Sequence, residues 1–162
     1  MMKALRILAA ILAAAGMPAL AGTVEVKFAD PQQYADVGGT RGEQFQNLEK
    51  IARHLERLAL RLPANQTLRV DVLEVDMAGT QFGLNPRVVR NMADIPRLQL
   101  RYTLLAGGQV VASGEDYLSR LDYARNTAGT FNRSYESLYD EKRLLDEWFA
   151  TRFGGHMHAT RY

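Results

Sequence analysis

The clearest pattern along the chain is the alternation of apolar and polar side chains between positions 96 and 118. In the first half of this stretch every second residue is apolar: Leu98, Leu100, Tyr102 and Leu104. A period of two places these side chains on one face of a strand. Gly107 and Gly108 then supply the positive backbone angles of a tight turn, and alternation resumes over residues 110–117. The stretch therefore predicts a β-hairpin with one apolar face, which needs a covering layer.

Two longer segments have the period of an α-helix and predict that cover. The first spans Glu43 to Leu62, where apolar side chains recur at steps of three and four on one side: Phe45, Leu48, Ile51, Ala52, Leu55, Leu58, Ala59 and Leu62. Thr40 and Glu43 have the spacing of a capping box at its start, and Pro63 ends it. Its other side is charged and includes His54.

The second helix is expected from Tyr135 to Phe153, with Ser134 as its N-cap and the pair Gly154 and Gly155 as its end. Bulky side chains gather on one side: Tyr135, Leu138, Tyr139, Leu145, Trp148, Phe149 and Phe153. An aromatic face of this size suits packing on a sheet. Lys142 lies within the same arc and is the one charge out of place there.

Two further strands are expected before the hairpin. Residues 23–28 alternate, and residues 67–77 alternate until Val72, after which the apolar positions change phase at Leu73. This change predicts either a β-bulge or a strand covered on both faces. Residues 78–91 are irregular, with a candidate short edge strand at 87–90, and residues 122–133 fit either a surface loop or a ragged strand. Together these elements predict an α/β (α+β) two-layer sandwich, with about four antiparallel or mixed strands and two helices on one face.

Residues 1–21 have the pattern of a secretory signal peptide. Lys3 and Arg6 precede ten residues of isoleucine, leucine, alanine and glycine, and residues 19–21 fit a small-residue cleavage site. This apolar run is half as long as the ~20 residues of a membrane span, so an uncleaved anchor is the weaker interpretation. The pattern predicts cleavage after Ala21 and export to the periplasm. The length of the remaining chain predicts a single domain over residues 22–155, and residues 156–162, after the glycine pair, are expected to form a flexible tail.

Charge and cysteine content exclude several classes of function. The chain has 20 basic and 18 acidic side chains, and Lys3 and Arg6 account for the whole excess, so the exported part is neutral overall. A neutral chain has no long-range attraction for nucleic acid or anionic lipid. The absence of cysteine excludes disulfides, thiol nucleophiles, thiolate metal sites and a lipid attachment site after the leader.

The candidate binding residues are Asp76, Glu115 and Lys142. Asp76 lies where the phase change of its strand ends, and other acids lie in or beside strands: Asp71, Glu74, Asp94 and Asp116. Paired carboxylates can act as general acid and base when their surroundings separate their pKa values. An outward-facing strand position, however, commonly holds a solvated acid. Lys142 either extends past Tyr139 to water or pairs with Asp76 or Glu115, and no catalytic residue is assigned.

The tail offers candidate metal ligands. His156, Met157 and His158 combine imidazole and thioether groups that suit copper, but the tail lacks the further ligands of a closed site. A serine nucleophile is disfavoured because residues 113–115 lack the pattern of a nucleophile elbow. The sequence has no glycine-rich phosphate loop, zinc motif or other pattern that implies a cofactor.

Three stretches together resemble a known family: residues 71–79 (DVLEVDMAG), 94–102 (DIPRLQLRY) and 139–149 (YDEKRLLDEWF). Their order behind a signal peptide is similar to that of exported proteobacterial proteins catalogued as domain of unknown function 3016. The likeness covers residues 24–153. It implies export and a single domain, and it transfers no catalytic residues because the family has no established activity.

The leading functional hypothesis is an exported, soluble, non-catalytic domain of the cell envelope. It would bind an unidentified envelope protein or a small ligand through the open face of the sheet or through residues 78–91. The alternatives are a hydrolase or other enzyme that uses carboxylates around Asp76, and a periplasmic metal-handling protein that uses the tail. The patterns imply no nucleic-acid partner and no transmembrane segment after signal cleavage, and they do not determine the oligomeric state.

Overall fold

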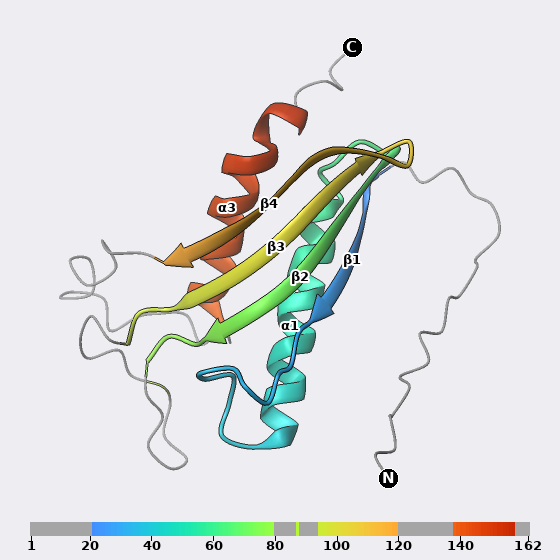
Figure 1. The fold of residues 1–162 in the computed structure, drawn as a ribbon. Coiled ribbons are helices and arrows are strands. Elements are labelled where there is room, and N and C mark those ends of the chain that lie inside the picture. The colour runs from blue at the N-terminus through green and yellow to red at the C-terminus, as the bar shows by residue number, and fades with distance from the viewer. Residues whose placement is uncertain (1–20, 80–86, 88–93, 120–137, 158–162) are drawn as a thin grey trace, which may run out of the picture.

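The fold is a two-layer α+β sandwich, as predicted. The computed structural model describes residues 21–79, 87, 94–119 and 138–157. In chain order its elements are β1 (Thr23–Phe28), α1 (Arg41–Ala59), β2 (Gln66–Asp76), β3 (Arg97–Ala106), β4 (Gln109–Ser119) and α3 (Tyr139–Met157). The four strands form one mixed sheet in the order β1-β2-β3-β4, and both helices lie on the same side of it (Figure 1).

The strand directions follow from the connections. β1 and β2 are parallel, because α1 carries the chain back between them, whereas β2, β3 and β4 are successively antiparallel. Between Val72 and Glu74 the pairing of β2 with β3 shifts by one residue, which confirms the predicted bulge. The bulge lets Val72 and Val75, three residues apart, both lie fully buried on the helix-facing side.

The hairpin turn also forms where glycine predicts it. Gly107 and Gly108 have φ angles of 56° and 83°, a region that glycine adopts without steric cost. A second shift in pairing lies beside this turn, between Leu104 and Leu105, and it leaves Val111 without a partner on β3. Residues 112–119 of β4 pair regularly with β3 beyond this point.

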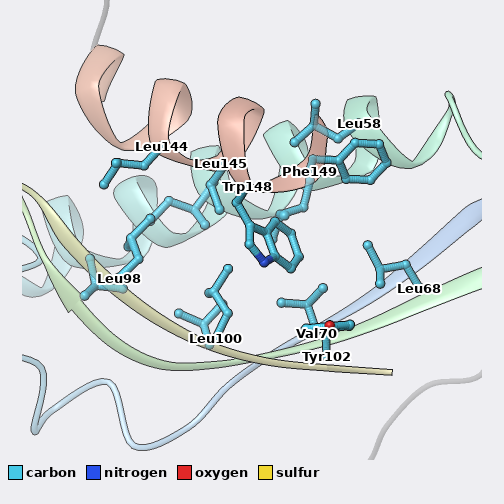
Figure 2. Close-up of a cluster of buried hydrophobic side chains, with 14 of the residues drawn as sticks. Leu58, Leu68, Val70, Leu98, Leu100, Tyr102, Leu144, Leu145, Trp148 and Phe149 are labelled. Atoms are coloured by element: carbon cyan, nitrogen blue, oxygen red, sulfur yellow. The ribbon is translucent and has the colours of Figure 1, made fainter. Parts of the chain in front are cut away.

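The core lies between the sheet and the two helices. Figure 2 shows side chains of α1, α3 and the sheet pointing into the same space, with the Trp148 indole directed from α3 toward the strands. Leu55, Leu145 and Phe149 are completely buried there, and Leu48 packs partly buried against them. Aromatic rings of Tyr102, Trp148 and Phe153 meet edge to face, the favoured arrangement of such pairs.

The first helix departs from the predicted pattern at one apolar residue. The capping box of Thr40 and Glu43 is present as expected, and the helix ends at Ala59, three residues before the predicted end. Phe45, which the periodicity places in the buried stripe, is 71% exposed. The reason is its position near the start of α1, a part of the helix that extends past the end of β1 (Figure 1).

The bounds predicted for the second helix were wrong at both ends. Leu138 has a φ of 62°, which a continuous right-handed helix cannot contain, so α3 begins at Tyr139 rather than Tyr135. The helix also continues through the two glycines to Met157. Glycine costs about 1 kcal/mol in a helix interior, and the burial of Phe153 in the core holds the turn that precedes Gly154. Tyr139 is 39% exposed and lies off the buried face.

Several predicted features lie outside the described residues. These are the N-cap at Ser134, the stretch at residues 122–133, all but Arg87 of the candidate edge strand at 87–90, and the tail from residue 158 onward. None of the helices among the described residues has the length and apolar character needed to cross a bilayer.

Candidate functional site

A groove lies between the edge strand β4 and helix α3. Its walls come from both elements: Asp116, Tyr117, Leu118 and Ser119 of β4, and Leu144, Glu147, Trp148, Thr151 and Arg152 of α3. The groove holds about 360 Å³, within the range of small-ligand sites. Its lining combines apolar side chains with charged and hydroxyl groups. This combination is typical of binding sites, where apolar contact supplies affinity and a few polar groups fix orientation.

Asp116 organises the polar side of the groove. It occupies a helix-facing position of β4, in line with Ala112, Gly114 and Leu118, and only 12% of its side chain is exposed. Trp148 Nε1 donates to Oδ2 over 2.9 Å and Arg152 Nε donates to the same oxygen over 2.8 Å, while Arg152 Nη2 donates to Oδ1. Charge-assisted bonds of this kind are what allow an acid to occupy a largely buried position.

Arg152 is held by one edge of its guanidinium. The hydrogen bonds that Arg152 donates to Asp116, together with the negative charge of Asp116, raise the pKa of Arg152 above its usual value, so the group stays cationic. Nε and Nη2 form the bidentate pair with Asp116. Within the described part of the chain, Nη1 contacts no acceptor, and 47% of the Arg152 side chain is exposed. A planar guanidinium fixed in this way presents its second donor edge to an incoming acceptor.

The open face of the sheet has a different character. Opposite charges alternate across the four strands at one register position: Lys27, Asp71, Arg101 and Glu115. Two residues along on the same face, Glu25 accepts from Arg69 over 2.9 Å. Hydrogen bonds from Gln99 and Arg101 lower the pKa of Glu115. Because these charges compensate one another, the face is well suited to contact with water.

The structure does not bring the three predicted binding residues together. Asp76 pairs with Arg97 over 2.7 Å, and Glu115 pairs with Arg101 over 3.0 Å. Arg97 and Arg101 are four residues apart on β3, so the two acids lie roughly 13 Å apart along the open face. Lys142 belongs to α3 on the opposite side of the sheet, where its charge helps to lower the pKa of His54. A binding role for each of the three stays a prediction.

His54 was wrongly placed on the charged face of the first helix. It is only 8% exposed and lies between α1 and α3, where Nε2 meets Asp146 Oδ1 at 2.8 Å and Nδ1 meets Arg57 Nη2 at 2.9 Å. Arg57 can only donate, so Nδ1 accepts and the ring proton lies on Nε2, facing Asp146. Burial lowers the pKa of His54 in spite of the opposing effect of Asp146, and Arg57 and Lys142 lower it further. Since both ring nitrogens are engaged, this arrangement joins two helices and leaves no nitrogen for proton transfer to a substrate.

The lowered pKa of His54 predicts a pH-dependent stability. In the unfolded chain His54 has its ordinary pKa of 6.5, whereas in the folded chain the pKa is lower. Below pH 6.5 the unfolded chain therefore binds a proton that the folded chain does not yet bind. The free energy of unfolding falls as the pH drops from 6.5 toward the folded pKa. Urea denaturation at pH 7.5 and pH 5.5 measures this change. The variant His54→Gln should lack this part of the pH dependence, and an equal loss of stability in both proteins would contradict the assignment.

A second buried group, Glu141, was not singled out from the sequence. It is 2% exposed, and its Oε1 accepts from the backbone N–H of Ala78 over 2.6 Å. Burial raises the pKa of Glu141. Beside this contact, Arg87 pairs with Asp36 and donates to the carbonyl oxygens of residues 78 and 79 over 2.9 and 2.7 Å. The Glu141 bond ties α3 to the segment after β2, the Arg87 bonds tie Arg87 to the same segment, and both satisfy backbone groups that no strand or helix pairs.

No cluster of three or more histidine, aspartate or glutamate side chains suited to a metal ion occurs among the described residues. Of the proposed tail ligands, His156 and Met157 belong to the last turn of α3, and His158 lies outside the described residues. The metal hypothesis for the tail therefore stays a prediction.

Comparison with known protein families identifies a match over most of the chain. The model of the family described as protein of unknown function (DUF3016) matches residues 22–151. No curated protein and no solved structure matches the chain.

Proposed function

We propose, from the premise that the chain belongs to the DUF3016 family of proteins of unknown function, that it is a non-catalytic binding domain exported to the cell envelope. The leader pattern of residues 1–21 supports export. The groove between β4 and α3 is the observation on which the binding role rests. It offers a ligand the apolar surfaces of Leu118, Leu144 and Trp148 together with the cationic edge of Arg152.

The state of the acidic side chains supports binding over catalysis. A general acid or base must reach a substrate proton and have a pKa near the working pH. Asp76, Glu115 and Asp116 each lie in an ion pair with an arginine, so the carboxylate oxygens that a substrate would have to reach are already engaged. Glu141 has a raised pKa, but it is 2% exposed and bonded to the backbone. The alternative of an enzyme around Asp76 gains no support from these contacts.

The only tryptophan of the chain reports on the groove, which makes the proposal testable without knowledge of the natural ligand. Two probes serve: 3-phenylpropionate, and a pool of random heptapeptides. We expect at least one of them to change the emission of Trp148 at millimolar concentration or below. Thr151→Phe, which fills the groove from an exposed position, should abolish the change. The proposal fails if neither probe alters the emission of the wild-type protein.

The matched control for this experiment is Ala150→Phe. Position 150 is exposed on the same helix, and it does not line the groove. This variant should bind like the wild type, because the same ring is added outside the site. Equal loss of the response in both variants would show that the effect of Thr151→Phe does not arise in the groove. Amino-terminal sequencing of the exported protein, with Gly22 as first residue, checks the export part of the proposal.

A further inference from the structure

The groove runs beside an open strand edge. β4 is the last strand of the sheet and has 11 residues. Among the described residues, no strand pairs with its outer side. Every second residue of an edge strand directs its N–H and C=O away from the sheet, so β4 presents a row of donors and acceptors along the groove.

The composition of this edge favours contact with another chain. Of the large hydrophobic side chains that are exposed in the described residues, half lie on β4: Val110, Val111 and Tyr117. The strand contains neither lysine nor proline, the residues that most often prevent pairing at an edge. Its bulge lies at the hairpin end and leaves residues 112–119 regular. Its two acids each lie in an ion pair within the protein, Glu115 with Arg101 and Asp116 with one edge of Arg152.

The side-chain alternation of β4 determines what an added strand would meet. Helix-facing positions of a neighbouring strand continue the row of Ala112, Gly114, Asp116 and Leu118, and they would project into the groove. A side chain directly across from Asp116 would lie about 5 Å from it, measured between Cβ atoms. Arg152 binds Asp116 with Nε and Nη2, which leaves Nη1 as the donor that could reach this side chain. An acidic side chain at this position would be bound by Arg152, while apolar side chains two residues away would cover Leu118 and Leu144.

We propose that the ligand of the groove is an extended peptide segment of a partner protein, which pairs with β4 as a fifth strand. This inference rests on the proposed binding function. The central helix-facing residue of the segment is acidic and is bound bidentately by Arg152, and the helix-facing residues on either side of it are apolar. Strand addition supplies affinity through main-chain hydrogen bonds, and the groove supplies specificity through alternate side chains.

A designed heptapeptide tests this proposal by Trp148 emission and by calorimetry. It is acetylated and amidated, with valine, glutamate and valine at positions two, four and six and threonine elsewhere. We expect it to bind, and we expect the peptide with glutamine at position four to bind about tenfold more weakly, because it lacks the charge-assisted bond to Arg152. Two further peptides are N-methylated, one at the odd-numbered amides and the other at the even-numbered amides. Each has lost the N–H donors along one edge of the strand. The peptide whose methylated edge faces β4 should not bind.

Variants of the protein locate the contact. Arg152→Gln should weaken binding of the glutamate peptide and remove the difference between glutamate and glutamine, while thermal melting reports whether the variant is folded. Arg152→Lys, which keeps the charge without the planar fork, should retain part of the difference and serves if Arg152→Gln does not fold. Arg53→Gln is the control, because Arg53 is an exposed arginine of α1 that pairs with Glu49, and neither residue lines the groove.

The outcomes separate this inference from the proposed function. Equal affinity for the glutamate and glutamine peptides overturns the role of Arg152, and unimpaired binding of both N-methylated peptides overturns strand addition. If N-acetylglutamate amide binds as tightly as the heptapeptide, the groove is a small-molecule site, so the inference fails while the proposed function stands. If the heptapeptide does not bind but 3-phenylpropionate does, the inference likewise fails and the proposed function stands. If no probe changes the emission of Trp148, both fail.

Discussion

Replacing Phe149 by alanine is expected to lower the free energy of unfolding by about 4 kcal/mol, measured by urea denaturation. The Phe149 side chain is completely buried, and its ring lies 5.1 Å from the ring of Phe153 and 6.5 Å from that of Trp148, measured between centroids. Alanine would leave a cavity where α3 packs on α1 and the sheet. The loss combines the transfer energy of the ring with the contacts that the cavity walls no longer make.

Phe45→Ala is the matched control, since it makes the same substitution on an exposed surface. Phe45 is 71% exposed near the start of α1. Its replacement is expected to change the free energy of unfolding by less than about 0.5 kcal/mol. A loss below about 1 kcal/mol for Phe149→Ala, or equal losses at the two positions, would contradict the packing of α3 on the sheet.

Glu141→Ala is expected to lower the free energy of unfolding by about 2 kcal/mol. The variant leaves the N–H of Ala78 without its acceptor in a place where Ala78 is only 8% exposed. A buried donor without a partner costs the protein the hydration that it loses on folding. Glu141→Gln keeps an oxygen at the same position and removes only the ionisable group, so it should be as stable as the wild type at pH 7 or more stable.

The pH dependence of Glu141 has the opposite sign to that of His54. Because burial raises its pKa, the folded chain holds a proton that the unfolded chain releases above its ordinary value of 4.5. The stability that Glu141 contributes is complete below pH 4.5 and is lost as the pH rises through the folded pKa. The advantage of Glu141→Gln over the wild type should therefore grow across that interval. A constant difference between pH 4 and pH 7 would show that Glu141 is not buried as a carboxyl group.

Much of the fold follows from local patterns. The alternation in residues 98–104 and the glycines at 107 and 108 correspond to β3, its turn and the start of β4. The change of phase after Val72 corresponds to the bulge of β2. These predictions succeed because a period of two or 3.6 residues fixes which side chains share a face, whatever that face packs against. The errors concern residues near the ends of helices, where the surroundings depend on how far each helix extends. Phe45 near the start of α1 and Gly154 near the end of α3 are examples.

The groove could be predicted only in part. The sequence identified Asp116 only as one of several acids in or beside strands, and Trp148 only as part of the aromatic face, and nothing local joins residues that are 32 positions apart. Alternation places Asp116 on the same side of β4 as Leu118, facing the helices. A carboxylate on the core side of a strand requires a hydrogen-bond or ion-pair partner, so this position could have been identified from the sequence. The identity of the partner, Arg152, depends on how α3 crosses the end of β4. The same holds for His54 and Asp146, which are 92 positions apart.

Short-range order along the chain decides which residues form strands and helices, where glycine turns them and which side of each is apolar, because these properties depend on neighbours within about one helical turn. Tertiary structure alone decides that Asp116 meets Arg152, that His54 is neutral between two helices and that Glu141 reaches the backbone of Ala78. These contacts require elements from distant parts of the chain to pack at one register and one crossing angle. Packing of the whole core sets both, and no single segment encodes them.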